Sequence, residues 1–237
     1  MTNILTLYHG SPKIVEKPVF GGGKENNDYG RGFYCTENQD LAKEWAVSAL
    51  QNGFANRYTI DTTYLKILDL NSPAYNILHW IAVLTGHRVF AVRTPLARRA
   101  RAYLVENFSI NVNAYDMIRG YRADDSYFDY AESFLNNGIT VEQLARAMRL
   151  GKPGEQIVIK SRYAFACLQY EGCEMAEYGK YYVRRASRNR EADRLYQQML
   201  EEEGDGLYMQ DILRGKIKND DPRIPGNAPF ESTDITG

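Results

Sequence analysis

Short runs of β-prone residues dominate the first 70 positions of the chain. Ile4 to Tyr8 is such a run, and it ends at His-Gly-Ser-Pro, a turn signal that would leave His9 at a strand end. Residues 32–35 form a second short run that leads directly into a helical pattern. Residues 57–70 are rich in β-branched and tyrosine side chains and predict one or two more strands.

Capping residues mark the predicted helices. Thr36 and Gln39 have the spacing of a capping box, and apolar residues then repeat at helical spacing until Gly53. Ser72-Pro73 and Thr94-Pro95 each match an N-cap followed by proline at the first helical position. These signals predict helices over 36–52, 73–90, 95–107, 127–136 and 140–150, the last one with a Thr140/Gln143 capping box.

The pattern returns to strands after this helical block. Residues 156–160 (Gln-Ile-Val-Ile-Lys) give the strongest strand signal, and Ser161 can cap a helix that follows. The remaining predictions are a helix to about 168, a strand over 178–185, a helix over 190–203 and further helix within 205–214. We therefore expect an α+β fold with one domain over 1–214, a helical insertion at about 72–150, and a flexible tail over 215–237, where Pro, Gly, Asn and Asp dominate.

Composition and charge narrow the class of protein. The chain carries 29 Lys and Arg against 30 Asp and Glu, so no global field favours nucleic acid or a membrane, and any charged partner must be recognised locally. The 3 cysteines form no C-x-x-C pair, and only 3 histidines accompany them, which favours a reduced cytoplasmic protein without a metal site. The longest apolar run, Ile77 to Leu84, is far shorter than the roughly 20 residues of a membrane span.

Three motifs stand in a suggestive order along the chain. They are Tyr-His-Gly-Ser at 8–11, Asp-Tyr-Gly-Arg-Gly-Phe-Tyr-Cys-Thr at 28–36, and Glu-Gln-Ile-Val-Ile at 155–159. Together they resemble the ADP-ribosyltransferase superfamily, in its His-Tyr-Glu branch of diphtheria-toxin-like enzymes and poly(ADP-ribose) polymerases. The whole-chain pattern is also similar to the bacterial domain-of-unknown-function family 3990, which is placed in that superfamily. The resemblance implies a split β-sheet core.

The resemblance also implies roles for individual residues. His9 would hydrogen-bond a ribose of NAD, and Gly10 would hold the nicotinamide carboxamide through its backbone. Tyr34 and Trp45 would sandwich the nicotinamide ring, although Trp45 also fits an ordinary core position because it shares a helix face with Leu41. The residues that the resemblance assigns to NAD binding are His9, Gly10, Ser11, Gly32, Tyr34 and Trp45.

Elementary chemistry supports this combination of residue types. Aromatic faces attract a flat cation such as nicotinamide, and glycine allows the backbone to approach a ligand closely. The transition state for cleavage of the bond between nicotinamide and ribose resembles an oxocarbenium ion, so a carboxylate nearby would stabilise it. The site should therefore contain an acid.

The carboxylate is the point at which the chain departs from the family pattern. The register of the polymerases places Gln156, and not a glutamate, before Ile157-Val158-Ile159. Glu155 is adjacent, but on a strand it would face the opposite way unless a bulge intervenes. Asp125, in the pair Asp124-Asp125, is the other carboxylate source, and it could instead cap a helix that begins near Tyr127. We favour Gln156 with Asp125 over Glu155.

The function that follows from the resemblance is mono-ADP-ribosylation of a macromolecule, with NAD as substrate and no metal. A protein acceptor is favoured over nucleic acid. Bacterial relatives of this kind include toxins of toxin-antitoxin and anti-phage systems, which implies an antitoxin protein as a partner. Two alternatives stay open, because Gln156 carries no charge: a catalytically silent module that binds NAD, ADP-ribose or a protein, and an NAD glycohydrolase that uses water as acceptor.

Overall fold

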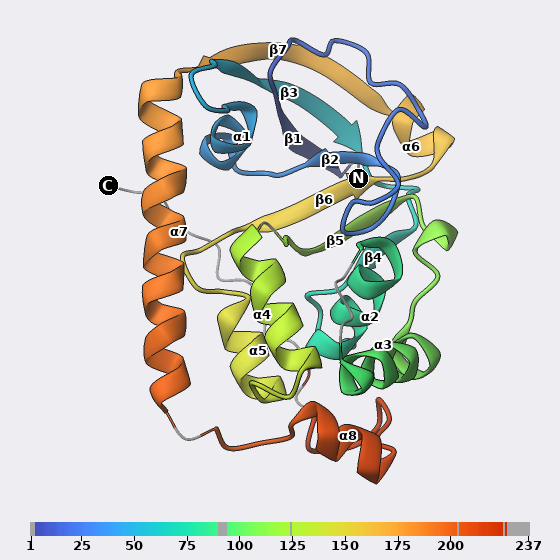
Figure 1. The fold of residues 1–237 in the computed structure, drawn as a ribbon. Helices are drawn as coiled ribbons and strands as arrows, with labels where there is room; N and C mark the ends of the chain where they lie inside the picture. Colours follow the sequence, from blue (N-terminus) through green and yellow to red (C-terminus); the bar gives the residue numbers. More distant parts are fainter. Residues whose placement is uncertain (1–2, 90–93, 124, 203, 225, 227–237) are drawn as a thin grey trace.

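A computed structural model describes residues 3–89, 94–123, 125–202, 204–224 and 226 of the chain, although not the side chains of 125 and 126. The fold is α+β, and the described residues form two β-sheets (Figure 1). One is antiparallel, in the order β1 (Ile4–Ser11), β3 (Gly53–Asp61) and β7 (Leu168–Ala176). The other has the order β2 (Phe33–Cys35), β6 (Glu155–Ile159), β5 (Met117–Tyr121) and β4 (Ile67–Asp69), with only β4 and β5 parallel.

The two sheets meet through a single backbone bridge. The Tyr8 N–H donates to the Thr36 carbonyl at 2.8 Å, and the Thr36 N–H donates back to the Tyr8 carbonyl at 3.0 Å. Extending this register by two residues would place Gly10 opposite Tyr34. Instead, Nδ1 of the His9 side chain lies 2.7 Å from the Tyr34 carbonyl. The sheets therefore part at His9 and Tyr34.

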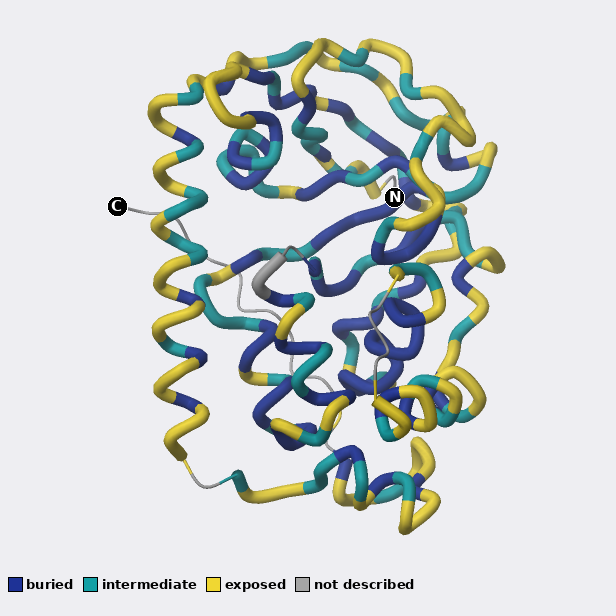
Figure 2. The backbone as a smooth tube through the Cα atoms, in the orientation of Figure 1, coloured by how far each residue is buried: buried dark blue, intermediate teal, exposed yellow. Residues whose placement is uncertain are grey.

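Helices fill the space on both sides of this junction. α1 (Gln39–Ala46) packs on β1 and β3, and a helical layer lies under the four-stranded sheet (Figure 1). That layer contains α2 (Ile77–His87), α3 (Pro95–Phe108), the short 3₁₀ helix η1 (Val112–Ala114), α4 (Asp125–Leu135) and α5 (Val141–Ala147). The first nine residues of α2 are all buried, which makes it the central helix of the core (Figure 2).

Three helices follow the last strand of the four-stranded sheet. α6 (Arg162–Ala166) links β6 to β7, α7 (Tyr178–Glu201) runs beside both the antiparallel sheet and the helical layer, and α8 (Met209–Gly215) packs at the end of that layer (Figure 1). No helix among the described residues is both long and apolar enough to cross a membrane.

Several local signals predicted these elements correctly. Thr94 caps α3 with proline at its start, the Thr140/Gln143 capping box begins α5, and Ser161 caps α6. The helix predicted from Thr36 instead begins after Asn38, whose side chain accepts from the Leu41 N–H at 3.0 Å. It ends at Ala46, well before Gly53, which belongs to β3.

Other predictions were wrong. The helix expected from Pro73 begins only after Asn76, which forms a capping box with His79. The strand expected over 178–185 is the first part of α7, and the strands β5 and β7 were not predicted. Of the segment expected to be a flexible tail, residues 215–224 and 226 are described, and Ile217 and Ile224 are buried in the core.

Gly10 is required by the packing of α1 on β1. A Cβ at this position would lie 2.0 Å from the Ala42 carbonyl oxygen, a backbone atom that cannot rotate away. We expect Gly10→Ala to lower the free energy of unfolding by about 1–3 kcal/mol, as other overpacked sites do. Urea denaturation measures this loss. Gly86→Ala is the control, because a Cβ there meets nothing within 4 Å; equal stability of the two variants would contradict the prediction.

Candidate functional site

A cavity of about 940 Å³ opens where β1 and β2 part. Its walls come from both sheets, from the loop over 12–32, from α1 and from α7. Five of the residues assigned from the sequence line it: His9, Gly32, Tyr34, Trp45 and Gln156. The structure thus brings together residues that are up to 147 positions apart in the sequence.

His9 presents one ring nitrogen to this cavity. Nδ1 lies 2.7 Å from the Tyr34 carbonyl, which can only accept a hydrogen bond, so Nδ1 carries the proton. Burial lowers the pKa of His9 below 6.5, and the hydrogen bond to Tyr34 only partly opposes this effect. The ring packs against that of Phe33 with the centroids 4.3 Å apart and the ring planes tilted by 34°. At neutral pH His9 is therefore a neutral imidazole whose Nε2 is an acceptor.

The side chain of Tyr34 is held at its hydroxyl by two hydrogen bonds. Its hydroxyl donates to the Gly30 carbonyl at 2.6 Å and accepts from the Tyr29 N–H at 3.1 Å. Gly30 has φ +73, and Lys160 Nζ donates to the carbonyls on either side of it, those of Tyr29 and Arg31, both at 2.8 Å. Burial raises the pKa of Tyr34 above its usual range and lowers that of Lys160 to about 8. The glycine turn thus fixes the ring of Tyr34 at the cavity wall.

Trp45 lines the cavity from the last turn of α1. The guanidinium of Arg122 lies over its ring, 4.6 Å from the centroid, and the indole Nε1 is buried without a hydrogen-bond partner. The ring is therefore part of the cavity wall and also receives a flat cation.

Gln156 and Glu155 lie on opposite faces of β6. No bulge interrupts the pairing of β6 with β5, in which Gln156 faces Gly120 and Glu155 faces Tyr121. Gln156 is buried and lines the cavity, and its Oε1 has no hydrogen-bond partner.

Glu155 makes its contacts outside the cavity. It accepts from Asn71 Nδ2 at 2.6 Å and lies 3.3 Å from Arg119 NH1. Burial raises the pKa of this carboxyl, although Arg119 and Asn71 oppose the shift. Among the described residues that line the cavity, Gln156 occupies the place expected for the acid.

The other residues assigned from the sequence, Gly10, Ser11 and Asp125, are not among the described residues that line the cavity. Gly10 follows Tyr8 by two positions, so its backbone N–H and C=O lie on the edge of β1 that faces β2, at the mouth of the split. Ser11 is buried, and its hydroxyl bonds to the Lys13 carbonyl and accepts from Asn56 Nδ2 at 3.2 Å, which is a structural role. The side chain of Asp125 and the whole of Asp124 lie outside the described residues.

Basic side chains dominate the charge of the cavity. Lys13, Arg88, Arg122 and Arg185 line it, against Asp28 as the acid among the described lining residues. Arg88 Nε lies 3.4 Å from Asp28 Oδ1, so this pair is partly neutralised. The cavity is therefore suited to an anion, and the near-zero net charge of the chain gave no sign of it.

The wall formed by α7 was missed from the sequence. Tyr182, Arg185, Ala186 and Asn189 line the cavity at the i, i+3, i+4, i+7 spacing of one helix face. This helical spacing is present in the sequence, but a strand was predicted over 178–185 in place of the helix. Within the described residues, no cluster of His, Cys, Asp and Glu side chains could hold a metal ion.

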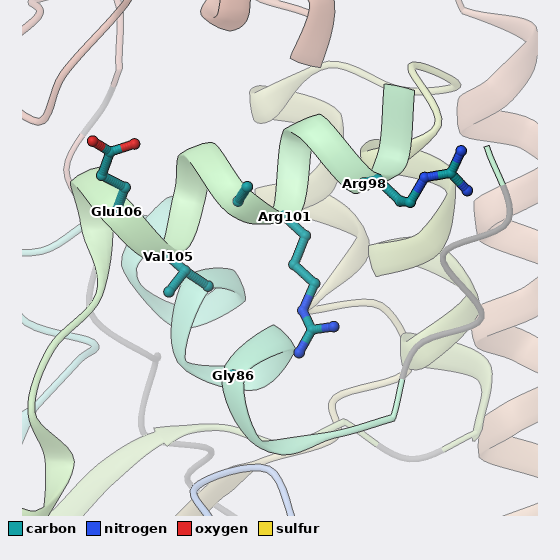
Figure 3. A pocket seen from close by; sticks show the side chains of 6 residues that line it. Gly86, Arg98, Arg101, Val105 and Glu106 are labelled. Atoms are coloured by element: carbon teal, nitrogen blue, oxygen red, sulfur yellow. The ribbon is translucent and has the colours of Figure 1, made fainter. Parts of the chain in front are cut away.

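A second hollow of about 580 Å³ lies beside α3 and the end of α2, and none of the motif residues lines it (Figure 3). Arg101 extends across it to the end of α2, where its Nε donates to the Thr85 carbonyl at 3.0 Å. Arg98 and Arg101 line this hollow from α3; Arg101 thus has a structural use, and neither side chain holds an unsatisfied buried polar atom.

A match to a protein-family model covers most of this site but not all of it. A family model described as "Protein of unknown function (DUF3990)" matches residues 5–170, which contain β1, β2, α1 and β6 but end before α7. No curated protein and no solved structure matches the chain. Because the match covers well over half of its length, the chain belongs to the DUF3990 family.

Proposed function

We propose that the protein is an NAD-dependent mono-ADP-ribosyltransferase that modifies a macromolecule, with a protein favoured as acceptor. The observation that carries the proposal is the meeting of His9, Tyr34, Trp45 and Gln156 in one basic cavity. A neutral His9 can accept from a ribose hydroxyl, and Gly10 offers backbone groups at the mouth of the split. The superfamily assignment and the role of NAD rest on the motif resemblance given above.

The charges of the cavity suit the nicotinamide and the pyrophosphate of NAD. The guanidinium of Arg122 on Trp45 supports an aromatic face that takes flat cations, as nicotinamide is in NAD. Lys13 and Arg185 would face the pyrophosphate. Under this proposal, nicotinamide either replaces the guanidinium of Arg122 or takes another face of the indole, and Arg122 becomes available to a phosphate.

A catalytically silent NAD or ADP-ribose module is the second candidate. It is favoured by Gln156, which is uncharged, and by Glu155, which makes its contacts with Arg119 and Asn71 rather than in the cavity. A role as the toxin of a toxin-antitoxin or anti-phage system, with an antitoxin protein as partner, belongs to the first candidate and rests on resemblance alone.

The experiment that separates these functions uses NAD labelled on its phosphates, incubated with the protein and a cell lysate. Protease-sensitive label identifies a protein acceptor, nuclease-sensitive label a nucleic acid, and free ADP-ribose alone a glycohydrolase. Binding without any of these products supports the silent module. Tyr34→Ala is the control that should abolish NAD binding, whereas Tyr34→Phe keeps the ring and loses only the hydroxyl bonds to the Gly30 turn.

The pH dependence of NAD binding should reveal His9. Because burial holds the folded-state pKa of His9 below 6.5, the ring stays neutral between pH 7 and 8, and affinity should be constant there. As pH falls through the lowered pKa, Nε2 gains a proton and can no longer accept, so affinity should fall. The unfolded chain binds this proton first, so folding stability contributed by neutral His9 is present above pH 6.5 and lost below it.

Isothermal titration calorimetry of NAD binding between pH 5 and 8 checks this dependence. His9→Gln is the control, because it removes the titrating group and should flatten the profile. An unchanged profile in that variant would assign the pH dependence to another group.

A further inference from the structure

α7 has two neighbouring faces with different contacts. One is fastened to α1: Arg184 NH1 donates to Asp40 Oδ2 at 2.9 Å, and Arg188 Nε donates to Glu44 Oε2 at 3.0 Å. Arg185 NH1 donates to the Glu44 and Val47 carbonyls at 3.2 and 3.1 Å. The other face carries Tyr182 and Asn189 into the cavity, and Arg185 lies at the border between the two faces because it also lines the cavity. The helix that lies beyond the family match is therefore held rigidly as one wall of the site.

Among the described residues that line this cavity, two buried side-chain acceptor atoms have no hydrogen-bond partner. Oε1 of Gln156, on β6, and Oδ1 of Asn189, on α7, are both buried without a hydrogen bond. Gln156 is 7% exposed, so it is a buried amide directed into a lined cavity. Buried polar atoms in folded proteins nearly always have partners, and a partner missing from the protein is expected from a ligand.

We propose that Asn189 is a substrate-positioning residue which, with Gln156, accepts hydrogen bonds from the two vicinal hydroxyls of a ribose. The inference rests on the proposed function and names the ribose next to nicotinamide as the group recognised. Amide oxygens are acceptors, and a vicinal diol offers two O–H donors side by side. The basic side chains of the same cavity suit the phosphates of such a ligand. The cavity therefore fits a ribose phosphate, whose hydroxyls are hydrogen-bond donors and whose phosphates are anionic.

The chemistry excludes some simpler roles for Asn189. The nearby Arg185 already donates to the backbone carbonyls of Glu44 and Val47 at the end of α1, and none of its hydrogen bonds goes to Asn189 Oδ1. The amide oxygen of an asparagine with a purely structural role would accept a hydrogen bond from the protein. The amide oxygen of Asn189 accepts no hydrogen bond from the described part of the protein, and Arg184 and Arg188 hold α7 in place at this position.

Calorimetric titrations with ADP-ribose and ADP test the proposal, because only ADP-ribose carries the second ribose. Asn189→Leu should weaken ADP-ribose about fivefold to tenfold, the value of one lost hydrogen bond, and leave ADP unchanged. Asn189→Asp keeps an acceptor oxygen and should stay within about twofold of the unmodified protein. Gln197→Leu, an exposed amide on the same helix, is the matched control and should bind both ligands normally. Melting temperatures of all variants should agree.

The outcomes separate this inference from the proposed function. An unmodified protein that binds neither ADP-ribose nor NAD overturns the proposed function and this inference with it. An unmodified protein that binds both, with Asn189→Leu indistinguishable from it, overturns the role of Asn189 alone. Equal weakening of ADP and ADP-ribose overturns the assignment to the second ribose. Loss of affinity in Asn189→Leu without rescue by Asn189→Asp overturns the role of the amide oxygen.

Discussion

Gln156→Glu is expected to raise the turnover of NAD about 100-fold, within the range measured for single groups that stabilise transition-state charge. Gln156 is buried in the cavity, and its Oε1 has no partner, so a carboxylate of almost the same shape fits the same place. The positive charge that develops on the ribose would then face a negative charge held in a site of low dielectric. Lys13, Arg122 and Arg185 line the cavity and favour the ionised form of the new acid.

Single-turnover release of nicotinamide measures this change separately from NAD affinity, which should change much less. Gln156→Leu removes the hydrogen-bonding atoms and should lower turnover. Glu155→Gln tests the alternative acid; because Glu155 contacts Arg119 and Asn71, this change should affect stability more than chemistry. Equal turnover of the Gln156→Glu variant and the unmodified protein, with NAD still bound, would show that position 156 does not face the reacting bond.

Sequence signals that act over four residues or fewer gave the most reliable predictions of the helices. Thr94, Thr140 and Ser161 each cap a helix through a backbone N–H three residues away. Thr36 had an equally good local pattern but is not a cap, because its backbone forms the bridge to Tyr8 that joins the two sheets. A contact 28 positions away thus took precedence over a local one, and Asn38 caps α1 instead.

The strands that the sequence did not predict are explained by tertiary packing. Gly120 interrupts the apolar pattern of β5, and a Cβ there would lie 2.2 Å from the Tyr29 hydroxyl, which donates to the Tyr121 carbonyl. Gly172, with φ +127, lies opposite a register shift in the edge strand β7, whose residues are exposed or half-buried except for Ala176. Gly120 therefore cannot be interpreted without the distant Tyr29 that packs against it, whereas Gly172 is restricted by its backbone conformation, since a Cβ there would meet nothing within 4 Å.

The two halves of the candidate site also differ in how far the sequence predicted them. The half formed by His9, Gly32 and Tyr34 was found from motifs, because these residues stand in short local patterns of the sequence and a Cβ on Gly32 would lie 2.5 Å from Val158 Cγ1. The half formed by α7 was not found, because Tyr182 and Asn189 are ordinary helix residues that gain a role only from their place opposite Trp45 and Gln156. Glu155 could be set apart from Gln156 by strand alternation alone, and the pairing of β6 with β5 contains no bulge.

Arg188→Met is expected to cost about 3–5 kcal/mol of unfolding free energy, because it leaves Glu44 as a buried charge without its partner. Arg188 and Glu44 are 11% and 7% exposed in their side chains, with Arg188 NH2 2.9 Å from Glu44 Oε2. This pair fastens α7 to α1, the helix that carries Trp45, so NAD binding should weaken as well.

Arg184→Met is the matched control on the same helix. Its ion pair with Asp40 is 46% and 38% exposed, and such pairs contribute about 0–1 kcal/mol. Urea denaturation of both variants, and of Arg188→Met combined with Glu44→Gln, separates the buried charge from lost packing. The double variant should recover much of the stability, because glutamine is neutral. If the two single variants lose equal stability, the pairing of Arg188 with Glu44 does not hold α7 against the site.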